Sequence, residues 1–333
     1  MTNTDAGQIH QTDVAIIGAG PVGLFAVFEC GMLKMQTHVI DALDAVGGQC
    51  KALYPEKPIY DIPGFPQIDG AALIDNLEEQ AAPFSPVYHL GQTVDALTQL
   101  EGDGGWKLTT SKGTQIEARA VIIAAGAGAF GPNRPPLEGL DAFEDAGCVH
   151  YLVRRREDFR DKKIVIAGGG DSAVDWAVSL ADVAASVTVV HRRAKFRAAP
   201  DTVGKMEALA ASGKIDLAVP YQLSALEGEG GSLSGVVLAD LDGNTRTVEA
   251  DHLLAFFGLA MNLGPIAEWG LELERSHIAV APATSATNAS GIFAIGDIAT
   301  YPGKLKLILQ GFSEAAMAAH AIHPLVFPGQ ALH

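Results

Sequence analysis

The stretch from residue 14 to residue 23 reads Val-Ala-Ile-Ile-Gly-Ala-Gly-Pro-Val-Gly, a short apolar run that stops at a glycine-rich turn. The pattern then predicts a helix over residues 24–35 and a second strand over residues 37–40, which Asp41 closes. This order of strand, glycine-rich turn, helix, strand and acid is typical of a fold that binds a dinucleotide.

Each glycine of this first turn has a physical task. Gly18 makes the tight turn, Gly20 lets the backbone approach a pyrophosphate, and Gly23 lets the helix pack on the strand. The helix N-terminus adds free N–H groups and a partial positive charge for the phosphates. Asp41 can accept hydrogen bonds from both hydroxyls of an adenosine ribose, so this turn predicts a dinucleotide with a free ribose.

The same pattern returns in the second half of the chain. A predicted strand over residues 163–167 leads into the turn Gly-Gly-Gly-Asp-Ser-Ala at 168–173. Residues 174–185 then predict a helix and residues 186–190 a second strand, after which the position of the acid holds His191. The chain therefore contains two copies of one nucleotide-binding unit.

The residue at the acid position distinguishes the second copy from the first. Its distance from the first glycine of the turn is 23 residues in both copies, but His191 is followed by Arg192 and Arg193. A carboxylate would repel a 2′-phosphate, whereas two guanidinium groups would bind one; the alternative for the arginines is a solvated surface pair. We expect NADPH rather than NADH here, bound by Gly168, Gly170, Asp171, Ser172, His191, Arg192 and Arg193.

A third signal lies near the C-terminus. Residues 291–297 read Gly-Ile-Phe-Ala-Ile-Gly-Asp, a predicted strand that ends in Gly-Asp, and a helix is predicted over residues 312–322. Asp297 can bind the ribityl chain of a flavin. Together with the two dinucleotide turns, this aspartate points to FAD at the first turn.

Composition limits the classes of function. The chain has 333 residues, 48% of them hydrophobic, and a net charge of −16, which disfavours binding to DNA or to an anionic membrane. Residues 1–13 carry no Lys or Arg and do not resemble a signal peptide. The three cysteines contain no Cys-x-x-Cys pair, which argues against a zinc site and a disulfide scaffold and favours the cytoplasm.

The segments between these landmarks predict how the domains are connected. A hairpin is predicted over residues 106–119, a stiff linker at 131–136, a surface loop at 227–235, and a returning strand at 253–258. The predicted fold class is α/β, with two Rossmann-like three-layer dinucleotide-binding domains, one inserted into the other. The FAD-binding domain is expected over residues 1–128 and 259–333, and the NADPH-binding domain over residues 129–258.

The chain resembles the flavoprotein reductases with two dinucleotide-binding domains, of which thioredoxin reductase is the best-known type. It is more similar to the ferredoxin–NADP+ reductase branch of that fold. The resemblance covers essentially the whole chain, and the segments that carry it are GAGPVGLF (18–25), GGQCKALYPEKPIYDIPGFP (47–66), GAGAFGP (126–132), GGGDSAVDWA (168–177), HRRAKFRA (191–198), LGPIAEWGL (263–271) and AIGDIATYPGK (294–304).

The resemblance implies which residues surround the flavin. Tyr54 would stack on the isoalloxazine ring, and His333 would cover the flavin across a homodimer. The FAD-binding residues that it implies, with those of the first turn, are Gly18, Gly20, Gly23, Asp41, Gln49, Tyr54, Val94, Phe130 and Asp297. No residue is expected to act as a catalytic acid, base or nucleophile, and no metal site is expected.

One departure from thioredoxin reductase decides the predicted function. That family carries a Cys-x-x-Cys dithiol just before the second glycine-rich turn, where this chain has Cys148 without a second thiol nearby. Dithiol exchange needs a resolving cysteine. The resemblance therefore implies hydride transfer from NADPH to FAD, followed by two one-electron steps to ferredoxin.

Other acceptors and another class of function stay open. Flavodoxin, quinone or oxygen could replace ferredoxin, and the chain could instead be a non-catalytic flavin sensor or scaffold, which would not need Arg192 and Arg193. Because ferredoxins are typically acidic and the chain is acidic overall, docking needs a local basic face. Two basic clusters are present, and the second, Arg192 and Arg193 with Lys195 and Arg197, is partly committed to NADPH. The candidate face is therefore the first cluster, and its alternative is a solvated helix or loop surface. It consists of Arg154, Arg155, Arg156, Arg160, Lys162 and Lys163.

Overall fold

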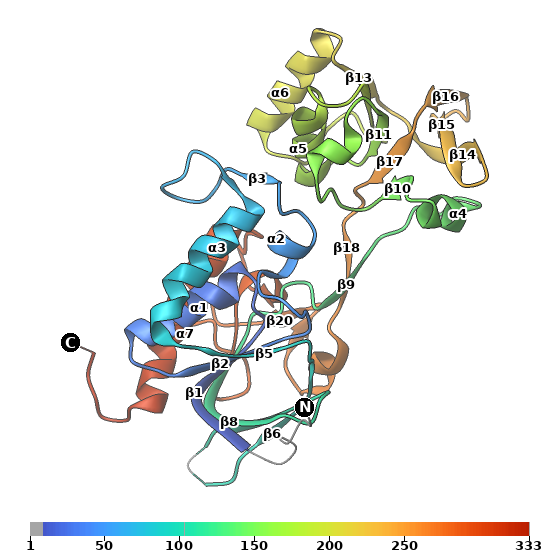
Figure 1. Ribbon diagram of the computed structural model, residues 1–333. Coiled ribbons are helices and arrows are strands. Elements are labelled where there is room, and N and C mark those ends of the chain that lie inside the picture. The colour runs from blue at the N-terminus through green and yellow to red at the C-terminus, as the bar shows by residue number, and fades with distance from the viewer. Residues whose placement is uncertain (1–8, 103, 333) are drawn as a thin grey trace, which may run out of the picture. The chain divides into compact units, whose positions relative to one another are not determined.

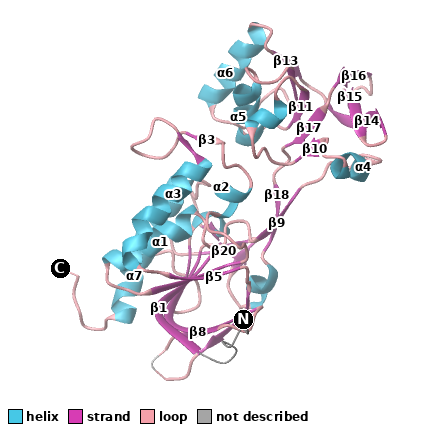
Figure 2. Ribbon diagram, viewed as in Figure 1, coloured by secondary structure: helices cyan, strands magenta, loops and turns pink. Residues whose placement is uncertain are grey.

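The computed structural model describes residues 9–102 and 104–332, which divide into two compact units (Figure 1). Unit 1 consists of the residues up to Ala52, Ile59–Phe130, and those from Met261 on. Unit 2 consists of Leu53–Pro58 and Gly131–Ala260. Both units combine helices with strands, as Figure 2 shows. The chain passes from unit 1 to unit 2 after Phe130 and returns after Ala260, and the short segment Leu53–Pro58 joins the second unit.

Unit 1 is built on a seven-stranded sheet in the order β5-β2-β1-β8-β7-β6, with β21 paired to β8. Strands β5, β2, β1, β8 and β21 are parallel, and β6, β7 and β8 form an antiparallel meander. The bounds are β1 Ile9–Ile17, β2 Thr37–Asp41, β5 Val87–Leu90, β6 Val94–Gln99, β7 Trp106–Thr110, β8 Gln115–Ile123 and β21 Ile292–Ala294.

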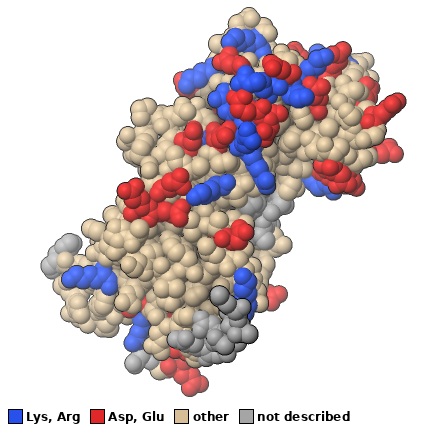
Figure 3. Space-filling model, viewed as in Figure 1, with Lys and Arg blue, Asp and Glu red and all other residues tan. Residues whose placement is uncertain are grey.

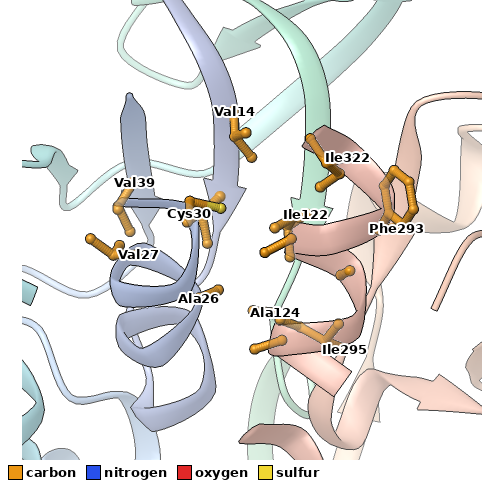
Figure 4. Packing of buried hydrophobic residues seen from close by; sticks show 14 of the residues in the cluster. Val14, Ala26, Val27, Cys30, Val39, Ile122, Ala124, Phe293, Ile295 and Ile322 are labelled. Atoms are coloured by element: carbon orange, nitrogen blue, oxygen red, sulfur yellow. The ribbon is translucent and has the colours of Figure 1, made fainter. Parts of the chain in front are cut away.

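Helices α1 (Pro21–Met32) and α7 (Ile308–Val326) cover one face of this sheet, and α3 (Gly70–Ala81) packs beside α1. Figure 4 shows how the apolar side chains of both helices meet those of the strands, with Cys30 of α1 between Val14 and Val39. The helices carry alanines where they approach the sheet, among them Ala26 and Ala318. These small side chains allow close packing, which holds the ends of both helices at fixed positions.

Smaller elements cover the opposite face of the sheet. Its core includes Ile17, Ile40 and Val121 from the strands and Ile266 and Ile278 from the segment that follows unit 2. The elements of unit 1 outside the main sheet are α2 Gly48–Ala52, β4 Ile68–Asp69, η1 Ala82–Phe84, η3 Gly264–Glu268, β19 Leu273–Glu274, β20 His277–Ala279, η4 Gly296–Ile298 and β22 Ala299–Thr300.

Unit 2 repeats the pattern with a five-stranded parallel sheet in the order β10-β17-β11-β12-β13. Helices α5 and α6 pack on one face around Trp176, and a three-stranded antiparallel sheet with helix α4 packs on the other. The bounds are α4 Leu140–Asp145, β10 Val149–His150, η2 Arg156–Phe159, β11 Lys163–Ala167, α5 Asp171–Leu180, β12 Ser186–Val190, α6 Pro200–Ala211, β13 Ile215–Ala218, β14 Gln222–Glu229, β15 Ser232–Ala239, β16 Thr245–Glu249 and β17 His252–Ala255.

Two predictions about the connecting segments need correction. The segment 227–235, predicted to be a surface loop, forms the tip of the β14–β15 hairpin, with its turn at Gly230 and Gly231. The linker predicted at 131–136 begins inside strand β9 (Ala129–Pro132), which pairs with β18 (Leu259–Asn262). The glycines of the tip masked this hairpin in the sequence, although Leu223, Leu226 and Leu233 of its two strands pack in a core of unit 2.

Strand β3 (Pro58–Ile59) pairs with β4 as a separate two-stranded sheet. Among the described residues, no helix combines the length and the apolar character that crossing a membrane requires.

Candidate functional site

The first glycine-rich turn is held tightly between β1, β2 and β8. The Gly18 amide donates to the Ile40 carbonyl at 2.8 Å, and Gly18 has a positive φ of 112°. A Cβ on Gly18 would lie 2.4 Å from the Ala124 carbonyl oxygen, and one on Gly23 would lie 1.9 Å from the Gly18 oxygen. Both positions therefore require glycine, Gly18 for the tight turn and Gly23 for the close approach of helix and strand.

Gly20 differs because space lies open in front of it. A Cβ there would meet nothing closer than the Gly48 Cα, 4.0 Å away. Gly20 is also the N-cap of helix α1, which has no side-chain cap, so the first N–H groups of the helix are free to donate to a ligand. Open space beside free helix N–H groups suits a pyrophosphate.

Asp41 lies at the end of β2, beside the turn. Its Oδ2 accepts from the Ala19 amide at 2.6 Å and its Oδ1 from the Leu43 amide at 2.8 Å. Burial raises the pKa of Asp41 above its ordinary value, and these two N–H donors oppose that shift. The carboxylate thus braces the turn and keeps lone pairs on both oxygens for ribose hydroxyls.

Two more predicted FAD residues lie near the same edge of the sheet. Gln49 is in helix α2, and its Nε2 lies 3.5 Å from where a Cβ of Gly126, just beyond β8, would be. Asp297 is in the 3₁₀ turn that follows β21, the neighbour of β8. The carboxyl ends of β1, β8 and β21 therefore gather Gly20, Gln49 and Asp297 at one edge of unit 1.

Val94 and Phe130 are less informative about the cofactor. The Val94 side chain is buried in the core on the face of the sheet opposite α1. Phe130 lies in strand β9, but its side chain is outside the described residues, as is the whole of His333. Their predicted roles stay predictions.

The second glycine-rich turn has the same backbone arrangement in unit 2. The Gly168 amide donates to the Val190 carbonyl at 3.1 Å, and a Cβ on Gly168 would lie 2.7 Å from the Phe256 oxygen. Gly170 is the uncapped N-cap of α5, and a Cβ there would meet no atom within 4 Å. This turn, too, leaves a helix N-terminus open to a phosphate.

The side chains around the second turn are different. The ring of His191 lies over the backbone of Gly169, where a Cβ would come within 2.2 Å of it, and stacks on Phe196 with ring centroids 5.0 Å apart. Burial lowers the pKa of His191 below its ordinary value. Asp171 Oδ1 accepts from the Ala199 amide at 2.9 Å. His191 and Asp171 therefore shape the loop, and Ser172 is exposed at the start of α5.

The two basic clusters of unit 2 differ in how their charges are compensated. Arg192, Arg193, Lys195 and Arg197 are exposed and form no ion pair with a described residue. Free guanidinium groups beside an open helix N-terminus suit a 2′-phosphate. Arg192 and Arg193 thus lie where the sequence predicted them, at the end of β12.

The cluster proposed for ferredoxin is largely paired. Arg155 contacts Asp158 at 3.8 Å, Arg160 contacts Glu157 at 2.6 Å, and Lys163 pairs with Glu249. The Arg156 guanidinium donates to the Ser179 carbonyl at 2.6 Å. Figure 3 accordingly shows blue and red side chains side by side on the unit that carries α5 and α6. This pairing weakens the long-range positive electrostatic field that the sequence suggested for this cluster.

Tyr54 belongs to unit 2, not to the FAD-binding unit that the sequence predicted for it. Its ring packs against the core around Trp176, and Lys57 Nζ lies 5.8 Å from the ring centroid. Lys57 in turn pairs with Asp175 of α5 at 3.0 Å. These contacts explain why Leu53–Pro58 joins unit 2; the stacking of Tyr54 on a flavin stays a prediction.

Among the described residues, no disulfide bond joins the three cysteines. Cys30 and Cys50 are buried, and Cys148 is partly exposed against the core of unit 2. Burial raises the pKa of the Cys30 thiol. Among the described residues, no group of His, Cys, Asp and Glu side chains could hold a metal ion.

Comparison with known proteins assigns the chain to a family. Residues 12–321 match the pyridine nucleotide-disulphide oxidoreductases. The ferredoxin–NADP reductase of Paramagnetospirillum magneticum is 64% identical over 97% of this chain and 96% of its own length. That of Granulibacter bethesdensis is 65% identical over 98% of this chain and 93% of its own length. The chain belongs to the ferredoxin–NADP reductase family.

Solved structures agree on the fold. A thioredoxin reductase from T. acidophilum has a TM-score of 0.83 at 22% identity and covers 94% of this chain and 98% of its own. One from Lactococcus lactis has a TM-score of 0.81 at 25% identity, with 95% and 99% covered. The predicted resemblance and the predicted α/β fold class are both confirmed. Family membership implies FAD and NADPH, and the open turns at Gly20 and Gly170 fit both.

The sequence did not predict two groups of polar side chains that come together in the structure. His10, His38 and His89 come from three strands of unit 1, and their ring centroids lie 5.1–5.6 Å apart. Glu314 is buried in α7 and contacts the turn that carries Asp297. No local pattern marks either group, because each forms only when distant segments fold together.

Proposed function

We propose that this chain transfers electrons between NADPH and ferredoxin through bound FAD. The observation that carries the proposal is the lone Cys148, which has no second thiol beside it in a chain with two open dinucleotide turns. Because dithiol exchange needs two thiols, the electrons would leave the flavin directly for an external acceptor and not through a thiol pair. The names of the most similar relatives support ferredoxin as that acceptor.

The residues of unit 1 would bind FAD. The free N–H groups that begin α1 after Gly20 would hold the pyrophosphate, and Asp41 would accept from the adenosine ribose. Asp297 and Gln49 would contact the flavin half of the molecule. When bound, FAD supplies the step from two-electron to one-electron chemistry, because it accepts hydride and can release electrons singly.

The residues of unit 2 would bind NADPH. The N-terminus of α5 beyond Gly170 would hold the pyrophosphate, and Arg192 and Arg193 would grip the 2′-phosphate. His191 and Asp171 would fix the loop that carries these arginines. Hydride transfer needs no protein acid or base, so the protein contributes position and charge.

Ferredoxin docking would use the charges that stay unpaired. Arg154 and Lys162 are exposed and form no ion pair with a described residue, whereas Arg155, Arg160 and Lys163 are paired. Arg154→Gln should lower kcat/KM for ferredoxin by only about 2- to 3-fold at low salt, with less effect as salt rises. Activity with ferricyanide is the control. An unchanged rate and salt dependence would remove this face from the docking surface.

The quaternary structure and location are also proposals. The resemblance supports a homodimer in the cytoplasm, and Leu305, Leu307 and Leu309 expose apolar surface on unit 1 that a second copy could cover. Light scattering on the FAD-loaded protein should give twice the mass of the chain. A monomeric mass would exclude the homodimer.

Reduction of cytochrome c by NADPH tests the proposed activity. It should require added ferredoxin, because cytochrome c then receives electrons only through that carrier. Rapid consumption of oxygen without ferredoxin would support an oxidase instead, and equal stimulation by flavodoxin or a quinone would support those acceptors. A protein that binds FAD but never reacts with NADPH would support a sensor or scaffold.

A further inference from the structure

Glu314 and Lys304 form a deeply buried ion pair in unit 1. Lys304 Nζ contacts Glu314 Oε1, and the two side chains are 6% and 0% exposed. Among the ion pairs of the described residues the next most buried, Lys57–Asp175, leaves 17% and 11% exposed. Burying two charges costs desolvation free energy, so such a pair is a weak source of stability. Its position needs another explanation.

Hydrogen bonds satisfy the rest of this buried group. The Gly296 amide donates to Glu314 Oε2 at 2.7 Å, and the Tyr301 hydroxyl donates to Oε1 at 2.6 Å. Gln310 Nε2 donates to the Tyr301 hydroxyl oxygen at 2.8 Å. Burial, helped by the bond to Glu314, raises the pKa of Tyr301 to about 12. The hydroxyl therefore stays protonated at neutral pH and continues to donate.

The bond to Gly296 connects this group to the cofactor site. Gly296 has a φ of 74°, a left-handed conformation, and its amide is the one that Glu314 holds. Asp297 follows directly, and its carboxylate makes no hydrogen bond to another described residue. Val22 of α1 packs here too, since Cβ atoms on Gly296 and Gly311 would lie 3.5 and 2.4 Å from its Cγ2. The Glu314 carboxylate is thus held in place by helix α7, and it in turn holds the backbone of the turn at Gly296.

We propose that Glu314, held by Lys304 and Tyr301, is a positioning residue for FAD. Its carboxylate fixes the Gly296 amide and so aims the Asp297 carboxylate at the ribityl hydroxyls. The inference rests on the proposed function, since it requires FAD in unit 1. Without this carboxylate the turn loses its anchor, FAD binds more weakly, and the surroundings of the flavin change.

Glu314→Gln tests this directly, because it keeps the size of the side chain and removes the charge. FAD binding to the apoprotein is measured by fluorescence, together with the visible circular dichroism of the bound flavin and the Tm of the apoprotein. We expect the Kd for FAD to rise on the order of 10-fold, the effect of losing one charge-assisted hydrogen bond. The visible circular dichroism should change with it.

A double-mutant cycle separates the roles of the two charges. Lys304→Met should weaken FAD binding more than Glu314→Gln does, because it leaves a buried carboxylate without its partner. Adding Glu314→Gln to Lys304→Met should bring the Kd back to the level of Glu314→Gln alone. Additive losses would contradict a coupled pair.

Two control variants distinguish positioning from general stability. Ala318→Gly weakens the same helix at a buried position outside the group, and it should lower Tm while leaving the Kd for FAD unchanged. Glu117→Gln makes the same chemical change at a partly exposed position of β8 and should alter neither. If Glu314→Gln binds FAD as the parent does, or if Ala318→Gly weakens FAD binding equally, the inference is wrong.

A milder variant keeps the test decisive if the Glu314 variant does not fold. Tyr301→Phe removes a single hydroxyl and should raise the Kd about 3-fold with a changed flavin spectrum; an unchanged Kd and spectrum would overturn the inference. The proposed function fails if the FAD-loaded parent protein does not pass electrons from NADPH to ferredoxin. This inference fails if the variants bind FAD as the parent does, so the two failures can be distinguished.

Discussion

The two glycine-rich turns share one backbone but differ in what braces them. In unit 1 the residue after the first glycine is Ala19, whose amide donates to the small Asp41 carboxylate. In unit 2 the same position is Gly169, because the larger ring of His191 lies where a Cβ would be. The closing residue therefore dictates the turn residue as well as the ligand.

This difference teaches how one fold comes to accept two cofactors. Both turns leave a helix N-terminus open at their third residue, Gly20 or Gly170, and so keep the site for a pyrophosphate. Only the end of the second strand changes, from a carboxylate that accepts from ribose to two unpaired guanidinium groups that suit a 2′-phosphate. The residues that select the cofactor are thus separate from those that bind the pyrophosphate, and each set can be tested alone.

The largest expected effect concerns how tightly each turn is packed. Gly23→Ala should destabilise unit 1 by about 3 kcal/mol or more and abolish FAD retention, because its Cβ would lie 1.9 Å from the Gly18 oxygen. The matching position of unit 2 already holds an alanine, so Ala173→Gly should cost only about 1–2 kcal/mol. Denaturant unfolding and FAD content measure both. If Gly23→Ala retains FAD like the parent, the turns are not packed as described.

The next effect concerns the 2′-phosphate. Changing Arg192 and Arg193 to Ala should raise KM for NADPH far more than KM for NADH, with roughly 10- to 100-fold expected from each arginine. The double variant Arg154→Ala/Arg155→Ala, in the same unit, is the matched control and should leave the preference for NADPH unchanged. Equal losses for both nucleotides would contradict the assignment.

A smaller effect follows from a histidine pair in each unit, which is buried in unit 1 and partly buried in unit 2. His38 of unit 1 contacts His89 at 2.9 Å, and His150 of unit 2 contacts His252 at 3.0 Å. Burial, reinforced by these neighbours, lowers the pKa of His38 and of His150 from 6.5 to about 4. Since the folded pKa lies below the ordinary value, the folded state binds fewer protons. Each pair therefore contributes full stability above pH 6.5 and loses it progressively as the pH falls towards 4.

The histidine variants assign this pH dependence to one unit or the other. His38→Gln should flatten the loss of stability on acidification for the transition of unit 1, and His150→Gln should do the same for unit 2. Unfolding by urea between pH 7.5 and about 4.5, followed by FAD fluorescence and by near-ultraviolet circular dichroism, measures each. An unchanged slope in both variants would mean that other groups bind the protons.

The smallest effect is expected at the thiol. Cys148→Ser should leave electron transfer from NADPH to ferredoxin within about 3-fold of the parent, because the side chain only packs at the edge of the unit 2 core. Steady-state cytochrome c reduction measures it, with Cys30→Ser as a buried comparison. Nearly complete loss of activity in Cys148→Ser would reveal a thiol relay.

The sequence predicted the features that depend on residues close together in the chain. The glycine turns, the hairpin of β7 and β8 and the strand before Asp297 are all encoded by neighbouring residues, and each was found where expected. Asp41 and Arg192 were likewise found beside their turns because a strand end fixes its next residue in space. The fold and the positions of these residues could therefore be predicted.

The rest depends on contacts between distant segments. Tyr54 was assigned to the FAD-binding domain by its place in the chain, yet its ring packs on the core of α5 and β12 in unit 2. The Glu227–Gly235 hairpin was hidden by its glycines. Glu314 looked like an ordinary polar residue in an alanine-rich helix, since its partners Gly296, Tyr301 and Lys304 meet it only in the folded chain.

A single-turnover experiment tests the central claim most directly. The FAD-loaded protein is mixed anaerobically with one equivalent of NADPH, and oxidised ferredoxin is then added while flavin absorbance is followed. The account predicts rapid bleaching with NADPH, much slower bleaching with NADH, and recovery of the flavin absorbance as ferredoxin is reduced. Bleaching by NADPH that ferredoxin cannot reverse, although a quinone or oxygen can, would contradict it.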